Sequence, residues 1–145
     1  MTTYKWETLP GLTTYLTTEL NSLASAGLKI GAAITAGNEM WMVVELAVAA
    51  QASARSAGAY VGIYVVRSLD GGSTYGYGSD SLTPGAHNLA ICLPLDAAVT
   101  ARVVNGLVFI PACTQCKLLL VNATGQAFAA TTNTLKYGFV SEIAE

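Results

Sequence analysis

The sequence predicts an all-β fold, an antiparallel β-sandwich that is jelly-roll-like and has roughly seven or eight strands, with one short N-terminal helix. Two observations predict it. Turn-forming residues recur along the chain at intervals of roughly ten residues. Between them lie segments rich in the β-branched and aromatic residues that a packed, pleated surface favours. No internal repeat or linker divides the 145 residues, so we expect a single domain with one core.

The clearest strand covers residues 40–50, where every even-numbered position is apolar. Its odd-numbered positions are also mostly apolar but smaller, which indicates that one face lies in a core. The other predicted strands are, in chain order, 59–68, 87–93, 99–110, 116–122 and 134–143. Asn105-Gly106 lies in the middle of one of them and can form a type I′ turn. We expect one strand with a bulge or bend there, and two short strands joined as a hairpin are the alternative.

The N-terminal region departs from this β pattern. Four leucines recur at helical spacing before a glycine that can cap a helix: Leu12, Leu16, Leu20 and Leu23, then Gly27. This spacing predicts a short helix, although the neighbouring threonines lose rotamer freedom in a helix. Residues 1–11 have no core periodicity, so we expect an N-terminal arm there and a sandwich domain over residues 12–145. Tyr4 and Trp6 lie in the arm, where they are expected to contact a neighbouring subunit or other partner. The alternative for Trp6 is that it fills the end of its own barrel.

The chain carries unusually little charge. Charged residues make up 11% and hydrophobic residues 52%, whereas soluble domains average about 25% charged. Much of the surface is therefore expected to face other protein. The basic residues are spread along the chain, which argues against nucleic acid as a partner. The start lacks a signal-peptide pattern, and the apolar segment 40–50 contains Glu45 and is too short to cross a bilayer. We expect synthesis in the cytoplasm and no membrane partner.

No residue pattern predicts catalysis, a cofactor or a metal site. Cys113 and Cys116 form half of a zinc motif without the other half, and we expect them, with Cys92, to be reduced structural thiols. His87 is the only histidine, and no strand-elbow motif places it beside a nucleophile. Glu45 lies in an apolar strand, where we expect an ion pair with Arg67, Arg102 or another subunit.

The glycine-rich segment 70–80 is the most loop-like part of the chain. Its two carboxylates, Asp70 and Asp80, supply too few ligands for calcium without additional carbonyl groups. Tyr75 and Tyr77 alternate with glycines, which leaves them free to contact a neighbour or a sugar ring. The alternative is that both tyrosines pack back over their own loop.

Three segments resemble small structural proteins of tailed-phage virions, of the capsid cement or decoration type. They are AGAYVGIYVVRSLDGGSTYGYGSD at 57–80, CLPLDAAVTARVV at 92–104 and NTLKYGF at 133–139. The resemblance implies a β-sandwich on the capsid surface of the virion that adheres to the shell of the major capsid protein and holds neighbouring capsomers together. It also implies a homo-oligomer, a dimer or trimer. The CxxC is not part of the resemblance.

The expected function is therefore non-enzymatic stabilisation of a capsid shell. The partner-binding residues we expect are Tyr4 and Trp6 of the arm and Tyr75 and Tyr77 of the glycine-rich loop, because large aromatic side chains supply most interface energy. The alternative is a receptor- or glycan-binding module of a phage tail or spike. A sandwich can carry out either function, so the fold class does not separate them.

Overall fold

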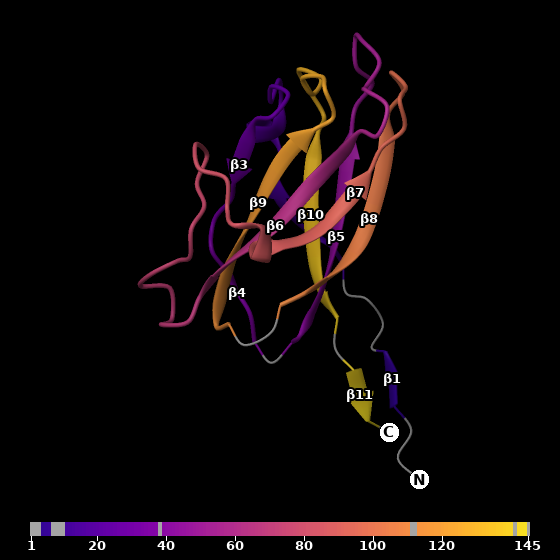
Figure 1. Cartoon of the computed structure of the whole chain (residues 1–145). Helices are drawn as coiled ribbons and strands as arrows, with labels where there is room; N and C mark the ends of the chain where they lie inside the picture. Colours follow the sequence, from indigo (N-terminus) through magenta and orange to yellow (C-terminus); the bar gives the residue numbers. More distant parts are fainter. Residues whose placement is uncertain (1–3, 7–10, 38, 111–112, 141, 145) are drawn as a thin grey trace.

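The computed structural model describes residues 4–6, 11–37, 39–110, 113–140 and 142–144. The fold is all-β, with two antiparallel sheets packed face to face (Figure 1). The strands are β1 (Tyr4–Trp6), β2 (Thr13–Leu16), β3 (Leu28–Ile30), β4 (Ile34–Thr35), β5 (Trp41–Val48), β6 (Tyr60–Ser68), β7 (Leu89–Pro94), β8 (Arg102–Phe109), β9 (Gln115–Ala123), β10 (Thr134–Val140) and β11 (Glu142–Ala144). No helix of the described residues is long and apolar enough to span a membrane.

The strand order is that of a jelly roll. One sheet has the order β2-β10-β5-β8 and the other β3-β9-β6-β7, with β4 also paired to β9. The chain changes sheet between β2 and β3, β4 and β5, β5 and β6, β7 and β8, β8 and β9, and β9 and β10. This interleaving of two Greek keys defines the jelly-roll sandwich. The predicted fold class is therefore confirmed.

The core lies between the two sheets, and β5 shows how the sequence forms it. Burial alternates along this strand, and the even-numbered Met42, Val44, Leu46 and Val48 are buried, as predicted. Because successive strand residues point to opposite faces, these side chains all enter the core. The facing sheet contributes buried residues of β6 and β9, which are Val61, Ile63, Val65, Leu118 and Leu120.

The segment around Asn105-Gly106 forms neither a hairpin nor a bulge. β8 pairs with β5 without a register shift, from Phe109 opposite Trp41 to Arg102 opposite Val48. The expectation of one continuous strand is confirmed, but the bulge expected in it is absent, because every residue of β8 keeps its pairing position with β5. A side chain at Gly106 would collide with Ile91 of β7, so the glycine serves close packing between the sheets.

The predicted N-terminal helix is wrong over most of its length. Residues 13–16 form β2, which pairs with β10, and within the predicted helix the only helical residues are the 3₁₀ turn η1 (Thr18–Leu20); a second 3₁₀ turn, η2 (Ala86–Asn88), precedes β7. Leu16 and Leu20 are buried in the core as expected. A strand and a single turn place them there without a helix, and the β-branched threonines favour the strand. Gly27 directly precedes β3 instead of capping a helix.

The two ends of the chain pair with each other. β1 and β11 form a separate two-stranded antiparallel sheet, in which Tyr4 lies opposite Ala144 and Trp6 opposite Glu142. Figure 1 shows this pair at one end of the molecule, beyond the two larger sheets. The rest of the predicted arm, residues 1–3 and 7–10, lies outside the described residues. Its contact with a partner remains a prediction.

Candidate interaction surface

The two tyrosines of the glycine-rich loop lie in different surroundings. The Tyr75 side chain is half-buried and donates a hydrogen bond from Oη to Gln115 Oε1 (2.7 Å). The ammonium group of Lys117 lies 4.0 Å from the centre of the Tyr75 ring, a cation–π contact. Tyr77 is 72% exposed. Tyr75 therefore packs on β9 of its own subunit, and Tyr77 is the tyrosine that faces solvent. The alternative in which both tyrosines pack over their own loop describes neither of them.

Asp70 organises the start of this loop. Its carboxylate accepts hydrogen bonds from Ser68 Oγ (2.7 Å), from the Thr74 backbone N–H (2.9 Å) and from Thr74 Oγ1 (2.6 Å). The Thr74 and Ser68 bonds lower the pKa of Asp70 well below its ordinary value. The Asp70 carboxylate therefore stabilises the turn between Ser68 and Thr74. Among the described residues, no group of three or more metal-ligating side chains comes together.

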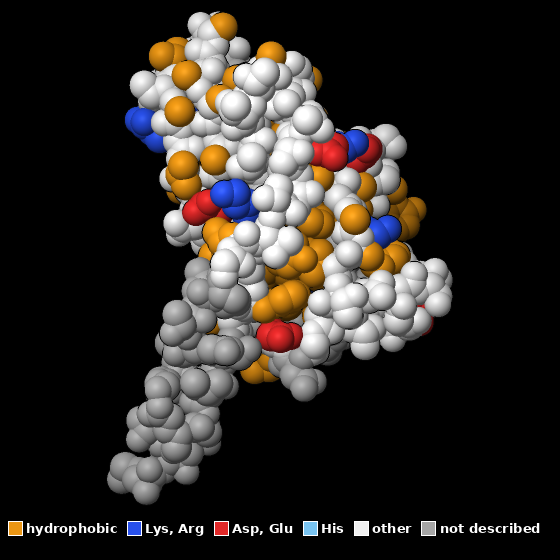
Figure 2. Space-filling model, turned by 180° about the vertical axis from the view of Figure 1, so that it is seen from behind, with side chains coloured by type: hydrophobic (Ala, Val, Ile, Leu, Met, Phe, Trp, Pro, Cys, Tyr) orange, Lys and Arg blue, Asp and Glu red, His pale blue; other side chains and the backbone are white. Residues whose placement is uncertain are grey.

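The largely apolar surface lies on the other side of the molecule, on the sheet β2-β10-β5-β8. Odd-numbered residues of β5 and β8 point away from the core there. We call this surface the outer face, and its members are Trp41, Val43, Glu45 and Ala47 of β5, Val103, Asn105, Leu107 and Phe109 of β8, and Lys136 of β10. Val103 is 62% exposed, and Leu107 and Phe109 are each 44% exposed. Figure 2 views the molecule from this side and shows few charged side chains on the described part.

The apolar residues of the outer face form a continuous strip along β5 and β8. Leu107 lies opposite Val43 and Val103 lies opposite Ala47. Trp41 and Phe109 are also opposite each other, and their ring centres are 4.8 Å apart. Cross-strand pairs of this kind stabilise the sheet. They also leave an apolar surface that water contacts in the isolated subunit.

The charges of this sheet are neutralised in pairs. Its four strands contain only Glu45, Arg102 and Lys136. Lys136 Nζ lies 3.8 Å from Glu45 Oε1, directly across the strand pair β5-β10. The expected partner of Glu45 was Arg67, Arg102 or another subunit, so the prediction of an ion pair holds but the named partners are wrong. The strand register explains why Lys136 is the partner of Glu45, since directly opposite residues are the nearest neighbours on a sheet face.

A shallow hollow of about 450 Å³ lies at one end of the outer face. It is lined by 47–50 at the end of β5, by 101–103 at the start of β8, and by Thr132. The small side chains of Ala47, Ala49 and Ala50 leave this space open. The hollow gives the apolar strip a concave end into which a partner's side chain can fit.

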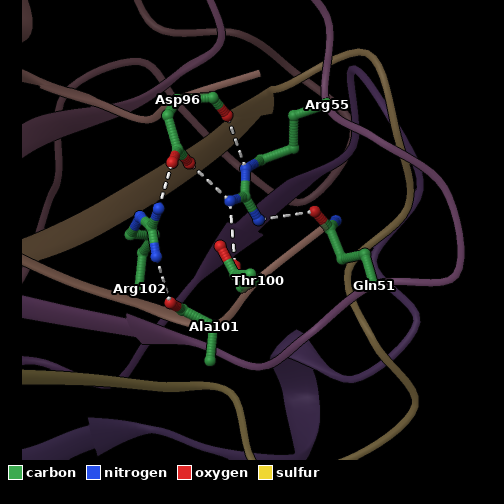
Figure 3. Close-up of polar contacts among 6 residues, drawn as sticks. All are labelled: Gln51, Arg55, Asp96, Thr100, Ala101 and Arg102. Carbon is green, nitrogen blue, oxygen red and sulfur yellow. Dashed lines mark hydrogen bonds and ion pairs between the residues drawn. The ribbon is translucent and has the colours of Figure 1, made fainter. Parts of the chain in front are cut away.

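A buried arginine fixes the loops beside this hollow (Figure 3). The Arg55 side chain is fully buried. Its guanidinium donates to Asp96 Oδ1 (2.7 Å), to the Asp96 carbonyl oxygen (2.9 Å), to the Thr100 carbonyl oxygen (2.9 Å) and to Gln51 Oε1 (2.9 Å). The other Asp96 oxygen pairs with Arg102. The hydrogen bond from Arg55, with that from Arg102, lowers the pKa of Asp96. The network ties the loop after β5 to the loop before β8 and so positions the start of β8.

The remaining chemistry-bearing residues are dispersed. All three cysteines are free thiols: Cys92 is exposed, Cys113 is half-buried and Cys116 is buried. Burial raises the pKa of Cys116 to about 12, so this thiol is not a nucleophile at neutral pH. Asp80 bonds to Lys29. Within the described part of the chain, no hydrogen bond joins His87 to a serine, a cysteine or a carboxylate.

Neither a family model nor a curated protein matches the sequence. Several solved structures are weakly similar to it. The sugar-binding C-terminal domain of EclA has 11% sequence identity and a TM-score of 0.39, over 94% of this chain and 83% of that one. A carbohydrate-binding module of family 4 has 10% identity and a TM-score of 0.38, over 80% and 61%. Such low scores and identities carry no argument about function.

Proposed function

We propose that the protein is a non-enzymatic structural subunit of a virion, a capsid cement or decoration protein that binds the assembled shell of the major capsid protein and stabilises it. The observation that carries the proposal is the outer face, an apolar strip whose few charges are internally paired. Contiguous exposed apolar surface on a small domain marks an interaction site. A flat sheet face without a deep polar cleft suits adhesion to another protein better than it suits catalysis.

Stabilisation of the shell follows from mass action. A subunit whose binding surface matches only the assembled shell favours that state over dissociated capsomers. Tyr4 and Trp6 of β1 and Tyr77 of the glycine-rich loop are the aromatic residues proposed to add contacts elsewhere than on the outer face. Tyr75 bonds within its own subunit, so we give it a supporting role in holding the loop.

The test uses phage particles produced without this protein, to which purified protein is added back. Particles lacking it are expected to assemble but to break at a lower temperature or a milder osmotic shock, and the wild-type protein should restore their resistance. Val43→Lys in the middle of the outer face should not restore it. Trp6→Ala should restore it only in part.

The matched control is Val121→Lys. Val121 lies in the middle of the other sheet, is half-buried and lies opposite Gly62, just as Val43 is half-buried and lies opposite Gly138. The control should bind and protect particles like the wild type, with a melting temperature close to that of Val43→Lys. Particles that are equally robust with and without the protein would refute the cement function. Loss of adsorption to host cells in those particles would instead support the receptor- or glycan-binding alternative.

A further inference from the structure

Three of the four outer edges of the sandwich are protected against pairing with another strand. β2 has four residues, and its pairing with β10 contains a register shift. β7 ends in Pro94, and its pairing with β6 is also shifted. The edge made by β3 and β4 is interrupted, and Asp80 covers it by accepting a hydrogen bond from the Ile30 backbone N–H (2.8 Å). Short strands, bulges, prolines and covering loops are the means by which sheet edges avoid unwanted association.

The fourth edge, β8, has none of these features. It is eight residues long, contains no proline, and pairs with β5 in one unbroken register. From Val103 to Phe109 it carries no charge. Figure 1 shows β8 at the right-hand margin of the molecule, and β5 is its only neighbour in the sheet. The other three edges are protected against pairing, whereas the edge of β8 is open. This difference indicates that β8 pairs with a strand of a partner.

The hydrogen-bond pattern shows which backbone groups are available. The Ile110 N–H donates to the Met40 carbonyl oxygen (2.8 Å), so this pair is a hydrogen-bonded pair of the β5-β8 ladder. Hydrogen-bonded and non-hydrogen-bonded pairs alternate in antiparallel sheets. The even-numbered residues of β8 therefore bond to β5. The odd-numbered ones, Val103, Asn105, Leu107 and Phe109, direct both N–H and C=O towards the free edge.

We propose that β8 pairs antiparallel with β8 of a second copy of this chain, about a two-fold axis at Gly106. Val103 then lies opposite Phe109 of the second copy, and Asn105 lies opposite Leu107 of the second copy. All four outward-directed residues bond to their counterparts, and the two sheets join into one eight-stranded sheet. Gly106 meets its own copy at the axis, in a non-hydrogen-bonded pair, where backbones approach most closely.

The charges of the outer face identify a second copy as the partner. A two-fold axis places each residue close to it beside the same residue of the second copy. An unpaired charge near the axis would therefore repel its own copy. None is present near the axis, because Val103 to Phe109 carry no charge and Glu45 is paired with Lys136. Arg102 lies at the far end of β8, where it shares Asp96 with Arg55. The apolar side chains Val103, Leu107 and Phe109 then pack against the same set from the second copy. The joined sheet presents two outer faces side by side. This inference does not depend on the capsid function.

The first test compares two lysine substitutions by analytical ultracentrifugation over a wide range of concentrations. The wild-type protein is expected to be a dimer. Leu107→Lys places a charge on the free edge of β8 and should abolish the dimer peak. Thr13→Lys places the same charge on β2, the opposite edge of the same sheet, and should leave the dimer intact. Circular dichroism should show all three proteins folded. A monomeric wild type, or a Leu107→Lys protein that remains dimeric, would overturn the proposal.

The second test determines the register in a background of Cys92→Ser. A mixture of Asn105→Cys and Leu107→Cys proteins should form a mixed disulfide on mild oxidation, because opposite residues of a hydrogen-bonded pair lie about 5.5 Å apart at Cα. Asn105→Cys alone should cross-link poorly. Efficient cross-linking of Asn105→Cys to itself would place the axis at Asn105 and overturn the register. A dimer without either cross-link would overturn the β8 edge as the interface.

Discussion

Arg55 is the residue on which the loop end of the sandwich depends most. Its guanidinium is fully buried, and its hydrogen bonds reach both the loop after β5 and the loop before β8 (Figure 3). Asp96 neutralises it from the solvent side. A buried charge is tolerated only where partners satisfy it, and four hydrogen bonds do so here.

Replacement of Arg55 by methionine should therefore lower the free energy of unfolding by about 2–4 kcal/mol, since several charged hydrogen bonds are lost and buried carbonyl groups lose a donor. Urea unfolding measures the change. Arg102→Met is the control, because Arg102 binds the same carboxylate from an exposed position and such pairs contribute at most about 1 kcal/mol. Equal effects of the two substitutions would contradict the role assigned to burial.

Several individual side chains were beyond prediction from the sequence. An ion pair of Glu45 was expected, but its partner depends on strand register, which places Lys136 directly opposite. Tyr75 and Tyr77 are each followed by a glycine in the same loop. Only Tyr75 can reach Gln115, which lies far along the chain on β9. Contacts between strands distant in sequence decide such outcomes, and no local pattern contains them.

At the scale of elements, Gly106 is required by packing between sheets and not by its own backbone conformation. A Cβ atom at this position would collide with Cδ1 of Ile91. We predict that Gly106→Ala lowers the free energy of unfolding by about 1 kcal/mol, the lower end of the usual cost of overpacking, because the colliding atom is the end of the half-buried Ile91 side chain.

Ile91→Val removes the colliding methyl group and provides the control. The double variant should be less destabilised than the sum of the two single variants, as a double-mutant cycle from urea unfolding will show. Additive effects would mean that strain in the β8 backbone, and not the contact with β7, accounts for the glycine.

The elements were predicted well where alternation was long and poorly where it was short. The strand predictions for 40–50, 59–68 and 116–122 coincide with β5, β6 and β9 within a few residues. The leucine spacing of residues 12–23 was compatible with a helix, yet tertiary pairing with β10 makes part of it a strand. The outer face and the free edge of β8 were not predicted, because strand order decides which strand lies at an edge.

At the scale of the whole molecule, acid should destabilise the fold through its aspartates. Partial burial opposes ionisation of Asp80, but hydrogen bonds from Lys29 and from the Ile30 N–H outweigh it and lower its pKa. The pKa values of Asp70 and Asp96 are also lowered. A carboxyl group whose folded pKa lies below its unfolded value stabilises the fold above the unfolded value and loses that contribution as the pH falls.

The free energy of unfolding should therefore be nearly constant between about pH 7 and pH 5, and should fall as the pH drops below about 4, near the unfolded pKa of aspartate. Urea unfolding at a series of pH values measures it. Asp80→Asn should reduce the steepness of the fall, since one of the titrating groups is removed. Stability that rises as the pH falls through this range would contradict the assignment.

The sheet pairings have a consequence for how the chain folds. Most of them are nested: β6 pairs with β7, β5 with β8, β3 with β9, β2 with β10 and β1 with β11. The described strands thus follow one long hairpin, whose turn includes the glycine-rich loop, and the two crossed pairings, β6 with β9 and β5 with β10, form where this hairpin wraps around itself. Loop-closure entropy grows with sequence separation, so we expect assembly to run outward from β6-β7. The pairing of Tyr4 with Ala144 is then expected as the last step, after the rest of the sandwich has formed.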